Sequence, residues 1–284
     1  MAKEKQSASE RISTEIIKGK SAQDHFEVRS LENTCPLLND FLKPDMKVLD
    51  IGCGPGTITI DLARQVSRGS VVGMDPNEEA LKNARASADE AGMVNIEFRA
   101  GETYSIEFPD KTFDLVFSNA LFSWLQEPAK ALKEQARVTR PGGWVIAMMR
   151  SIEFLVLFPE CPELRRIHAA YRSLKDASGD VPFFNSHPTH EAVKFLVDAG
   201  IQNYKILSFT PDLEVAYPGS EFFEYRYQQL ELSAFWTDKT YDYFLSKGLV
   251  DGNTLERARA EIEVWYRHPH ALFIWPVVAA CGHV

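Results

Sequence analysis

The chain contains 284 residues, of which 45% are hydrophobic and 25% charged, a composition that allows a globular protein with a sizeable core. Its formal net charge is -9, with Lys and Arg scattered among more numerous acids, which argues against nucleic acid as a partner. The polar N-terminus and the lack of an apolar run of about 18 residues predict neither a signal peptide nor a membrane span.

The cysteines are widely spaced and form neither a CxxC pair nor a metal-ligand cluster. They are Cys35, Cys53, Cys161 and Cys281. Reduced thiols of this kind indicate a cytoplasmic protein. His268 and His270 lie close together, but no third ligand with suitable spacing accompanies them, so no metal is expected.

Residues 1–45 are expected to form an N-terminal helical segment, because apolar residues recur with a helical rhythm over 21–43. Between 46 and 150, short apolar strands alternate with amphipathic helices, a pattern typical of βαβ units and a parallel sheet. The strands are predicted at 46–51, 70–75, 95–101, 113–120 and 144–150. The helices between them are predicted at 57–67, 77–92 and 128–139.

Residues 151–284 are predicted to complete the sheet with strands within about 200–216 and 271–284. Pro276 interrupts the last strand and favours a bulge or an edge position. Two segments, 151–188 and 217–268, are expected to form helical insertions that cap the mouth of the sheet. The pattern as a whole predicts a Rossmann-like α/β fold with a mostly parallel seven-stranded sheet flanked by helices.

A glycine turn at 52–56 follows the first strand of this core. Its order is GxGxG followed by Thr57, whereas a dinucleotide-binding loop has GxGxxG. Asp75 ends the next strand, where a carboxylate can accept hydrogen bonds from both hydroxyls of a ribose. The alternative for Asp75 is a cap of the helix that follows it.

Two further polar positions follow the next two strands. Glu102 comes just after the third strand, where its carboxylate can accept from an adenine amino group, although a solvated loop acid is the alternative. Asn119 ends the fourth strand, at the edge of a parallel sheet where ligands bind.

Four segments in this order resemble class I S-adenosylmethionine-dependent methyltransferases, in the "type 11" group that contains the ubiquinone/menaquinone-biosynthesis enzymes. They are VLDIGCGPGTITIDLA, VVGMDPNEEAL, FRAGETYSIEFPDKTFDLVFSNALFSWLQEP and RVTRPGGWVIA. The resemblance implies the class I methyltransferase fold, S-adenosyl-L-methionine as cofactor and S-adenosyl-L-homocysteine as product. It does not specify the acceptor.

The resemblance also implies a role for individual residues. Gly52, Cys53, Gly54 and Asn119 would line the methionine part of the cofactor. Asp75 would hold the ribose, Met74 and Pro76 would flank the adenine, and Glu102, standing where the group usually has Asp, would contact it. Thr103, next to Glu102, is also expected to bind the cofactor. The segment HFEVRSLENT resembles one that precedes the first strand in a subset of the family, so Arg29 would pair with the cofactor carboxylate. A salt bridge to Glu27 or Glu32 is the alternative for Arg29.

The catalytic residue is not identified by the sequence. Methyl transfer relies on the cofactor's reactivity and on positioning, with a base only where the acceptor needs one. Candidate bases lie in the expected cap, and each has a structural alternative in capping or packing: His168, Tyr171, His187, His190, Tyr225 and Tyr227. The aromatic residues of the cap favour a flat or lipophilic acceptor.

The sequence therefore predicts methyl transfer to a small molecule, with the accepting O, C, N or S atom unresolved, by a monomer or a homodimer. One alternative is a protein that binds S-adenosylmethionine for another purpose, such as cyclisation. A protein or nucleic-acid methyltransferase is a second alternative, and it lacks support because SNALF stands where Asn/Asp-Pro-Pro-Tyr/Phe would be expected. The GxGxG spacing disfavours a nicotinamide-dependent oxidoreductase.

Overall fold

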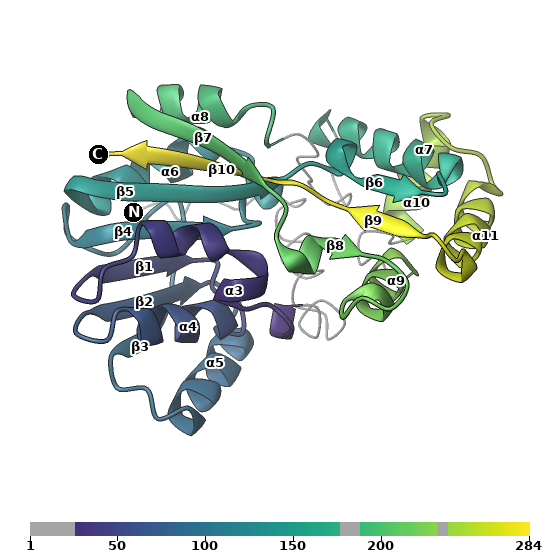
Figure 1. Ribbon diagram of the computed structural model, residues 1–284. Helices are drawn as coiled ribbons and strands as arrows, with labels where there is room; N and C mark the ends of the chain where they lie inside the picture. The colour runs from purple at the N-terminus through teal and green to yellow at the C-terminus, as the bar shows by residue number, and fades with distance from the viewer. Residues whose placement is uncertain (1–25, 177–187, 232–237) are drawn as a thin grey trace.

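The computed structural model describes residues 26–176, 188–231 and 238–284 (Figure 1). Its main element is a seven-stranded sheet of order β3-β2-β1-β4-β5-β10-β7. Strands β1 to β5 run parallel, and β10 is antiparallel to both of its neighbours. The strands are β1 Lys47–Ile51, β2 Ser70–Asp75, β3 Ile96–Ala100, β4 Phe113–Asn119, β5 Thr139–Arg150, β7 Asn203–Phe209 and β10 Val277–His283. The predicted Rossmann-like, mostly parallel seven-stranded fold is confirmed.

Alternating side chains of the central strands bury both faces of this sheet. Val48 and Leu115 pack in one cluster with residues of α3 (Leu31–Thr34) and α4 (Thr57–Gln65). Leu49 and Val116 pack in another with residues of α6 (Pro128–Val138) and α8 (Ala192–Asp198). A further cluster joins α4 to α5 (Glu78–Glu90) and β3. The continuous apolar pattern of β1 and β4 thus follows from helices on both faces.

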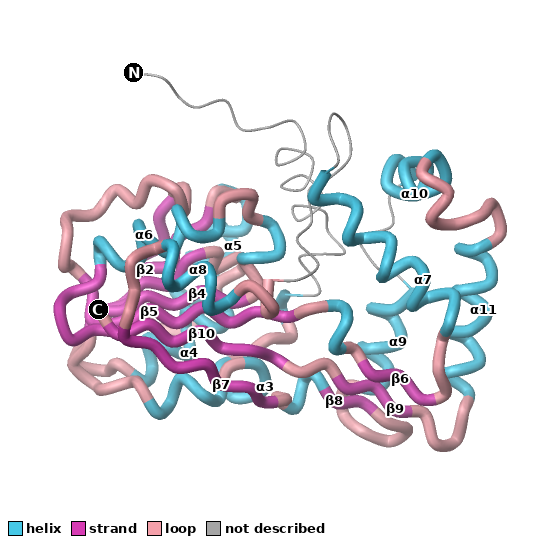
Figure 2. Tube along the Cα trace, turned by 90° about the horizontal axis from the view of Figure 1, so that it is seen from above, coloured by secondary structure: helices cyan, strands magenta, loops and turns pink. Residues whose placement is uncertain are grey.

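A second unit lies beyond the carboxyl end of β5, on the right in Figure 1, and is also seen in Figure 2. It contains a three-stranded sheet of order β6-β9-β8, whose strands are β6 Val156–Phe158, β9 Leu272–Ile274 and β8 Val215–Ala216. Four helices share its apolar core: α7 Pro162–Ala170, α9 Phe223–Glu231, α10 Asp238–Ser246 and α11 Thr254–Arg267. We refer to these strands and helices as the second unit. The sequence did not predict its small sheet, because strands of two or three residues carry no readable alternation.

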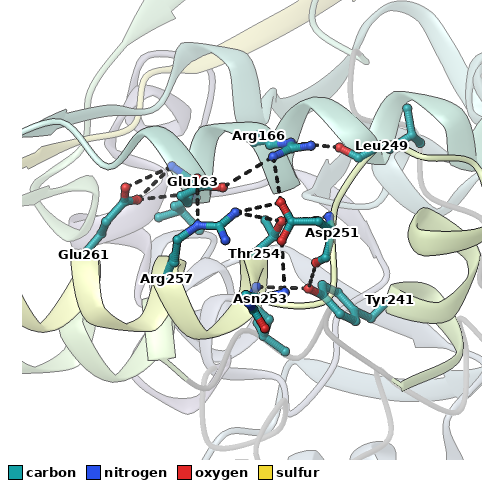
Figure 3. A network of polar contacts seen from close by, with 11 residues as sticks. Glu163, Arg166, Tyr241, Leu249, Asp251, Asn253, Thr254, Arg257 and Glu261 are labelled. Carbon is teal, nitrogen blue, oxygen red and sulfur yellow. Dashed lines mark hydrogen bonds and ion pairs between the residues drawn. The ribbon is translucent and has the colours of Figure 1, made fainter.

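Polar contacts fasten α7 to α11 inside the second unit (Figure 3). The carboxylate of Glu261 accepts hydrogen bonds from the backbone N–H of Glu163 at 2.9 Å and of Leu164 at 3.2 Å, at the start of α7. Arg257 donates to Glu163 at 2.9 Å and to Asp251 at 2.9 Å. The bonds to Glu261 satisfy N–H groups that the first turn of a helix leaves without an intrahelical partner, so α11 holds the start of α7.

Two predicted elements differ in the structure. Within the described residues of 21–43 the helical segments are short: residues 26–27, α3 and a 3-10 turn at Pro36–Asp40. Ser30 caps α3, and Pro36 disfavours helical backbone just before it. Pro276 marks neither a bulge nor an edge strand. It lies between β9 and β10, where the chain passes from one sheet to the other, and β10 is an inner strand. A residue without a backbone N–H is harmless at that crossing.

In the glycine turn after β1, Gly56 has less room for a side chain than Gly54. Gly54 and Gly56 both have positive φ, at 52° and 80°. A Cβ on Gly54 would meet nothing within 4 Å, whereas a Cβ on Gly56 would lie 2.8 Å from both Ala84 and the ring of Phe98. Helix α5 and strand β3 therefore approach the turn as closely as glycine permits.

We expect Gly54→Ala to lower the free energy of unfolding by about 1–2 kcal/mol, the cost of a left-handed backbone at alanine. Gly56→Ala should lose about 1–3 kcal/mol more, because the added methyl group overpacks the contact with Ala84 and Phe98. Urea unfolding followed by circular dichroism measures both values. Equal losses in the two variants would contradict the close approach at Gly56.

Candidate functional site

The carboxyl ends of four neighbouring strands form one edge of the main sheet. The order β2-β1-β4-β5 puts the ends of these parallel strands side by side (Figure 1). The chain leaves β1 toward β2 on one side, and β4 is added on the other, so β1 and β4 flank the topological switch point. Ligands of open α/β sheets bind in the crevice at such a point. The turn after β1, Asp75, Asn119 and Arg150 all lie at this edge.

The turn after β1 is anchored on the end of β2. The backbone N–H groups of Gly52 and Cys53 donate to the carbonyl of Met74 at 2.7 and 3.2 Å. Gly56 is the N-cap residue of α4, and Gly54 is the open position of the turn, since a Cβ there would meet nothing within 4 Å. The helix N-terminus and the bare backbone of the turn form a surface that a ligand can approach closely.

Asp75 connects the glycine turn with the start of α5. Its carboxylate accepts from the N–H of Gly54 at 3.0 Å and from the N–H of Asn77 at 2.8 Å. Asn77, not Asp75, caps α5, by accepting from the N–H groups of Glu79 and Ala80. Asp75 is partly exposed, and a carboxylate offers about four acceptor positions, so it can accept from several groups at once. The structure therefore suits the predicted ribose role of Asp75.

The residues predicted near the adenine gather where β3 ends. The N–H of Gly101 donates to the carbonyl of Asp75 at 3.3 Å, which ties this loop to the end of β2. Met74 is buried, with its sulfur against Gly101, whereas Pro76 and Glu102 are exposed. The hydroxyl of Thr103 is buried and has no hydrogen-bond partner among the described residues. An unpartnered buried hydroxyl in this loop is the kind of group that a polar ligand satisfies.

Asp50 is a buried acid that the sequence analysis did not single out. It is 3% exposed in β1, directly before the glycine turn, and the hydroxyl of Thr59 donates to it at 2.7 Å. Burial raises the pKa of Asp50 to about 7, against the lowering effect of the Thr59 hydrogen bond, and the charge of Asp75 adds to the rise. Asp50 could have been recognised from the sequence as an acid inside the apolar segment MKVLDI, because acids are rarely buried.

Asn119 points from the end of β4 toward β5. It is followed by Ala120, which has a positive φ of 58°, uncommon for a residue with a side chain. The side-chain oxygen of Asn119 accepts from Nη1 of Arg150 at 3.2 Å. The predicted site at the β4 end is therefore continuous with a charged group on the neighbouring strand.

Arg150 belongs to a buried charge cluster that the sequence analysis missed. Its Nε donates to Glu214 at 2.9 Å, and Nη2 of Arg226 donates to the other oxygen of Glu214 at 2.6 Å. Burial by itself would raise the pKa of Glu214, but the charges of Arg150, Arg226 and Arg29 outweigh it and lower that pKa. No sequence spacing could reveal this cluster, because its members come from β5, the 3-10 turn Asp212–Glu214 and α9.

Arg29 is placed beside the same cluster. Burial and the charge of Arg150 lower its pKa to about 10, and Tyr225 and Glu214 partly oppose this change. Its guanidinium lies over the ring of Phe26 at 4.8 Å. Arg29, from before α3, therefore lies among the charged groups near the ends of β4 and β5.

Most of the candidate bases are ill suited to that role. Burial lowers the pKa of His168 to about 3, and burial raises the pKa of Tyr171 well above its ordinary value. Tyr171 packs on Phe244 in the core of the second unit, Tyr227 donates to Glu263 at 2.7 Å, and His190 lies 3.7 Å from Glu153. Tyr225 lies near the arginines, and burial raises its pKa. His187 is outside the described residues.

Residues 26–176, 188–231 and 238–284 contain no cluster of three or more His, Cys, Asp or Glu side chains arranged to hold a metal. In the same part of the chain, no helix is both long and apolar enough to cross a membrane. Cys35, Cys53, Cys161 and Cys281 are all free and buried.

A model of a methyltransferase domain family, type 11, matches residues 49–147. An uncharacterized methyltransferase of Schizosaccharomyces pombe is 34% identical over 138 residues, which cover 46% of this chain and 50% of that protein. A ubiquinone/menaquinone biosynthesis C-methyltransferase of Shewanella is 28% identical over 195 residues, 63% of this chain and 76% of that protein. The structure of phosphoethanolamine N-methyltransferase 2 from Haemonchus contortus superimposes with a TM-score of 0.59 at 15% identity, over 96% of this chain and 60% of that one.

The sheet order and the glycine turn define a class I methyltransferase fold. The family match then identifies residues 49–147 as a methyltransferase domain of the type 11 group, which confirms the resemblance seen in the sequence. The chain spans about half the length of the first curated relatives, 50% and 56% of two of them.

The raised pKa of Asp50 predicts a pH-dependent stability. The folded protein holds Asp50 protonated up to about pH 7, whereas an aspartate outside the fold has a pKa of 3.8. Its contribution to stability is therefore greatest below pH 4 and is lost as pH rises toward 7.

We expect wild type to lose stability relative to Asp50→Asn between about pH 4 and pH 7, by on the order of 1–4 kcal/mol, and the difference to level off above that. Urea unfolding across this range measures it. Asp89→Asn, at an exposed acid of α5, should follow the wild-type profile. A difference between wild type and Asp50→Asn that does not change with pH would contradict the buried, protonated Asp50.

Proposed function

We propose that this protein transfers a methyl group from S-adenosyl-L-methionine to a small-molecule acceptor and releases S-adenosyl-L-homocysteine. The family match supports the methyltransferase class. The observation that carries the cofactor assignment is Asp75, whose carboxylate links the open glycine turn to the start of α5 at the switch point of the sheet. The unpartnered hydroxyl of Thr103, in the loop after β3, supports the same ligand.

The cofactor residues fall into three groups along the strand ends. Asp75 would bind the ribose hydroxyls, and the bare turn from Gly52 to Gly54 would accommodate the methionine part together with Asn119. Met74, Pro76, Glu102 and Thr103 would surround the adenine, and Arg29 would pair with the carboxylate of the amino acid. These roles follow the order of the strands, because β2 lies on one side of β1 and β4 on the other.

The chemistry requires alignment more than it requires an acid or a base. When bound, the cofactor supplies a methyl group on a positively charged sulfur, ready for displacement by an acceptor atom. The protein's task is to hold the acceptor in line and to keep water away, which the second unit beside the strand ends of β4 and β5 is placed to do. Removal of a proton would be needed only for an acceptor that is not already nucleophilic.

The class of acceptor, the cell compartment and the oligomeric state are proposed mainly from composition. A net charge of -9 disfavours nucleic acid, and the aromatic residues of the second unit favour a flat or lipophilic molecule. Four free cysteines agree with a cytoplasmic protein. A monomer or a homodimer would suffice, since the proposed cofactor residues all come from one chain. Binding of S-adenosylmethionine for another reaction, such as cyclisation, is the competing function.

We expect Asp75→Ala to weaken binding of S-adenosyl-L-homocysteine at least tenfold, equivalent to about 1.4 kcal/mol, by calorimetry. The loss should appear for adenosine but not for 2′,3′-dideoxyadenosine, which lacks the hydroxyls that Asp75 would bind. Asp89→Ala, at an exposed acid on α5, should bind like wild type. An equal loss for both nucleosides would mean that Asp75 only supports the turn, and an unchanged affinity would remove the ribose assignment.

Turnover is tested with S-adenosyl-L-methionine labelled on its methyl group and a cell metabolite extract. We expect label to enter a molecule small enough to pass a filter that retains protein and RNA. Label confined to protein or RNA would contradict a small-molecule acceptor. Tight binding of the cofactor without any transfer of label would favour the competing, non-methylating function.

A further inference from the structure

Three arginines converge at the carboxyl ends of β4 and β5 with one carboxylate among them. Arg150 and Arg226 are 6% and 2% exposed, Glu214 is 2% exposed, and the charge of Arg29 acts on all three. Arg150 and Arg226 share the single carboxylate of Glu214, so positive charge exceeds negative charge by one among these three groups. Burying unbalanced charge is costly, so a site with this excess is expected to meet an anion.

Glu214 does not satisfy both arginines equally. Arg226 makes three hydrogen bonds, two to the carbonyl of Leu213 at 2.8 and 2.6 Å and one to Glu214, and its guanidinium lies 4.8 Å from the ring of Phe273. Arg150 donates Nε to Glu214 and Nη1 to Asn119, but its Nη2 is buried without a hydrogen-bond partner among the described residues. Leaving such a donor unsatisfied costs about 1–3 kcal/mol, more for a charged group.

The position of Arg150 distinguishes it from the cofactor residues. Neighbouring strands lie about 4.8 Å apart, so the order β2-β1-β4-β5 puts Arg150 one strand beyond Asn119 and on the side away from Asp75. The proposed cofactor occupies the ends of β2, β1 and β4. Its single carboxylate is assigned to Arg29, which leaves the excess charge of Arg150 and Arg226 at the end of β5.

We propose that the methyl acceptor carries an anionic group, a carboxylate or a phosphate, and that Nη2 of Arg150 binds it at the end of β5. This inference rests on the function proposed above, because it names the class of acceptor for the same site. Glu214 and Asn119 act as positioning residues that hold the planar guanidinium with Nη2 available. A guanidinium fixed in this way suits the oxygens of a carboxylate or a phosphate.

The test uses protein saturated with S-adenosyl-L-homocysteine, so that the cofactor's own carboxylate is already in place. Benzoate, inorganic phosphate and benzamide, the neutral counterpart of benzoate, are titrated by calorimetry. We expect benzoate or phosphate to bind at least tenfold more tightly than benzamide. Arg150→Gln should lose that preference while its affinity for S-adenosyl-L-homocysteine stays within twofold of wild type. Arg140→Gln is the matched control, because Arg140 lies at the opposite end of β5 and pairs with Asp114.

Each other outcome overturns a defined part of the proposal. Binding of benzoate and phosphate no tighter than that of benzamide to wild type would remove the anion subsite, and this arm decides even if Arg150→Gln does not fold. A loss of affinity in Arg150→Gln for S-adenosyl-L-homocysteine, but not for 5′-methylthioadenosine, would assign Arg150 to the cofactor carboxylate and leave the proposed function intact. Failure of wild type to bind S-adenosyl-L-homocysteine would overturn the proposed function itself, and titration of the anions into the unloaded protein would then decide the subsite.

Discussion

The carboxylate of Asp75 holds together the parts of the molecule on which the proposed site depends. By accepting from the N–H groups of Gly54 and Asn77, the carboxylate joins the turn after β1 to the start of α5. The backbone carbonyl of Asp75 accepts from the N–H of Gly101 after β3. The ends of β1, β2 and β3 are thereby joined through one residue, by its side chain toward β1 and by its backbone toward β3. A ligand that binds Asp75 meets a turn and a loop that are already in place, so little ordering is left to oppose binding.

Buried charge is concentrated at the same edge of the sheet. Asp50 has a raised pKa because burial removes water and Asp75 lies near, whereas Glu214 has a lowered one because arginines surround it. Two acids with pKa values moved in opposite directions indicate an edge whose environment changes from acidic near β1 to basic near β5. Strongly shifted pKa values cluster at functional sites.

Charged side chains link the second unit to the main sheet, in addition to the connecting backbone. Glu214 precedes β8 and Arg226 lies on α9, yet both pair around Arg150 at the end of β5. Inside the unit, Arg257 and Glu261 of α11 hold the start of α7. The proposed acceptor group would bind where these two sets of elements meet, so the second unit would contribute to acceptor choice while the sheet binds the cofactor.

The sequence alone determined the alternation of strands and helices from β1 to β5, the glycine turn and Asp75, because these depend on periodicity and on residues adjacent in the chain. It could not determine that Pro276 separates two sheets, since an apolar run reads the same whether it enters one sheet or two. It also could not bring Arg29, Arg150 and Glu214 together, because they lie far apart in the chain and share no pattern. Only the tertiary structure, by setting β4 and β5 beside β1 and folding α9 back onto them, decided which charges meet at the site.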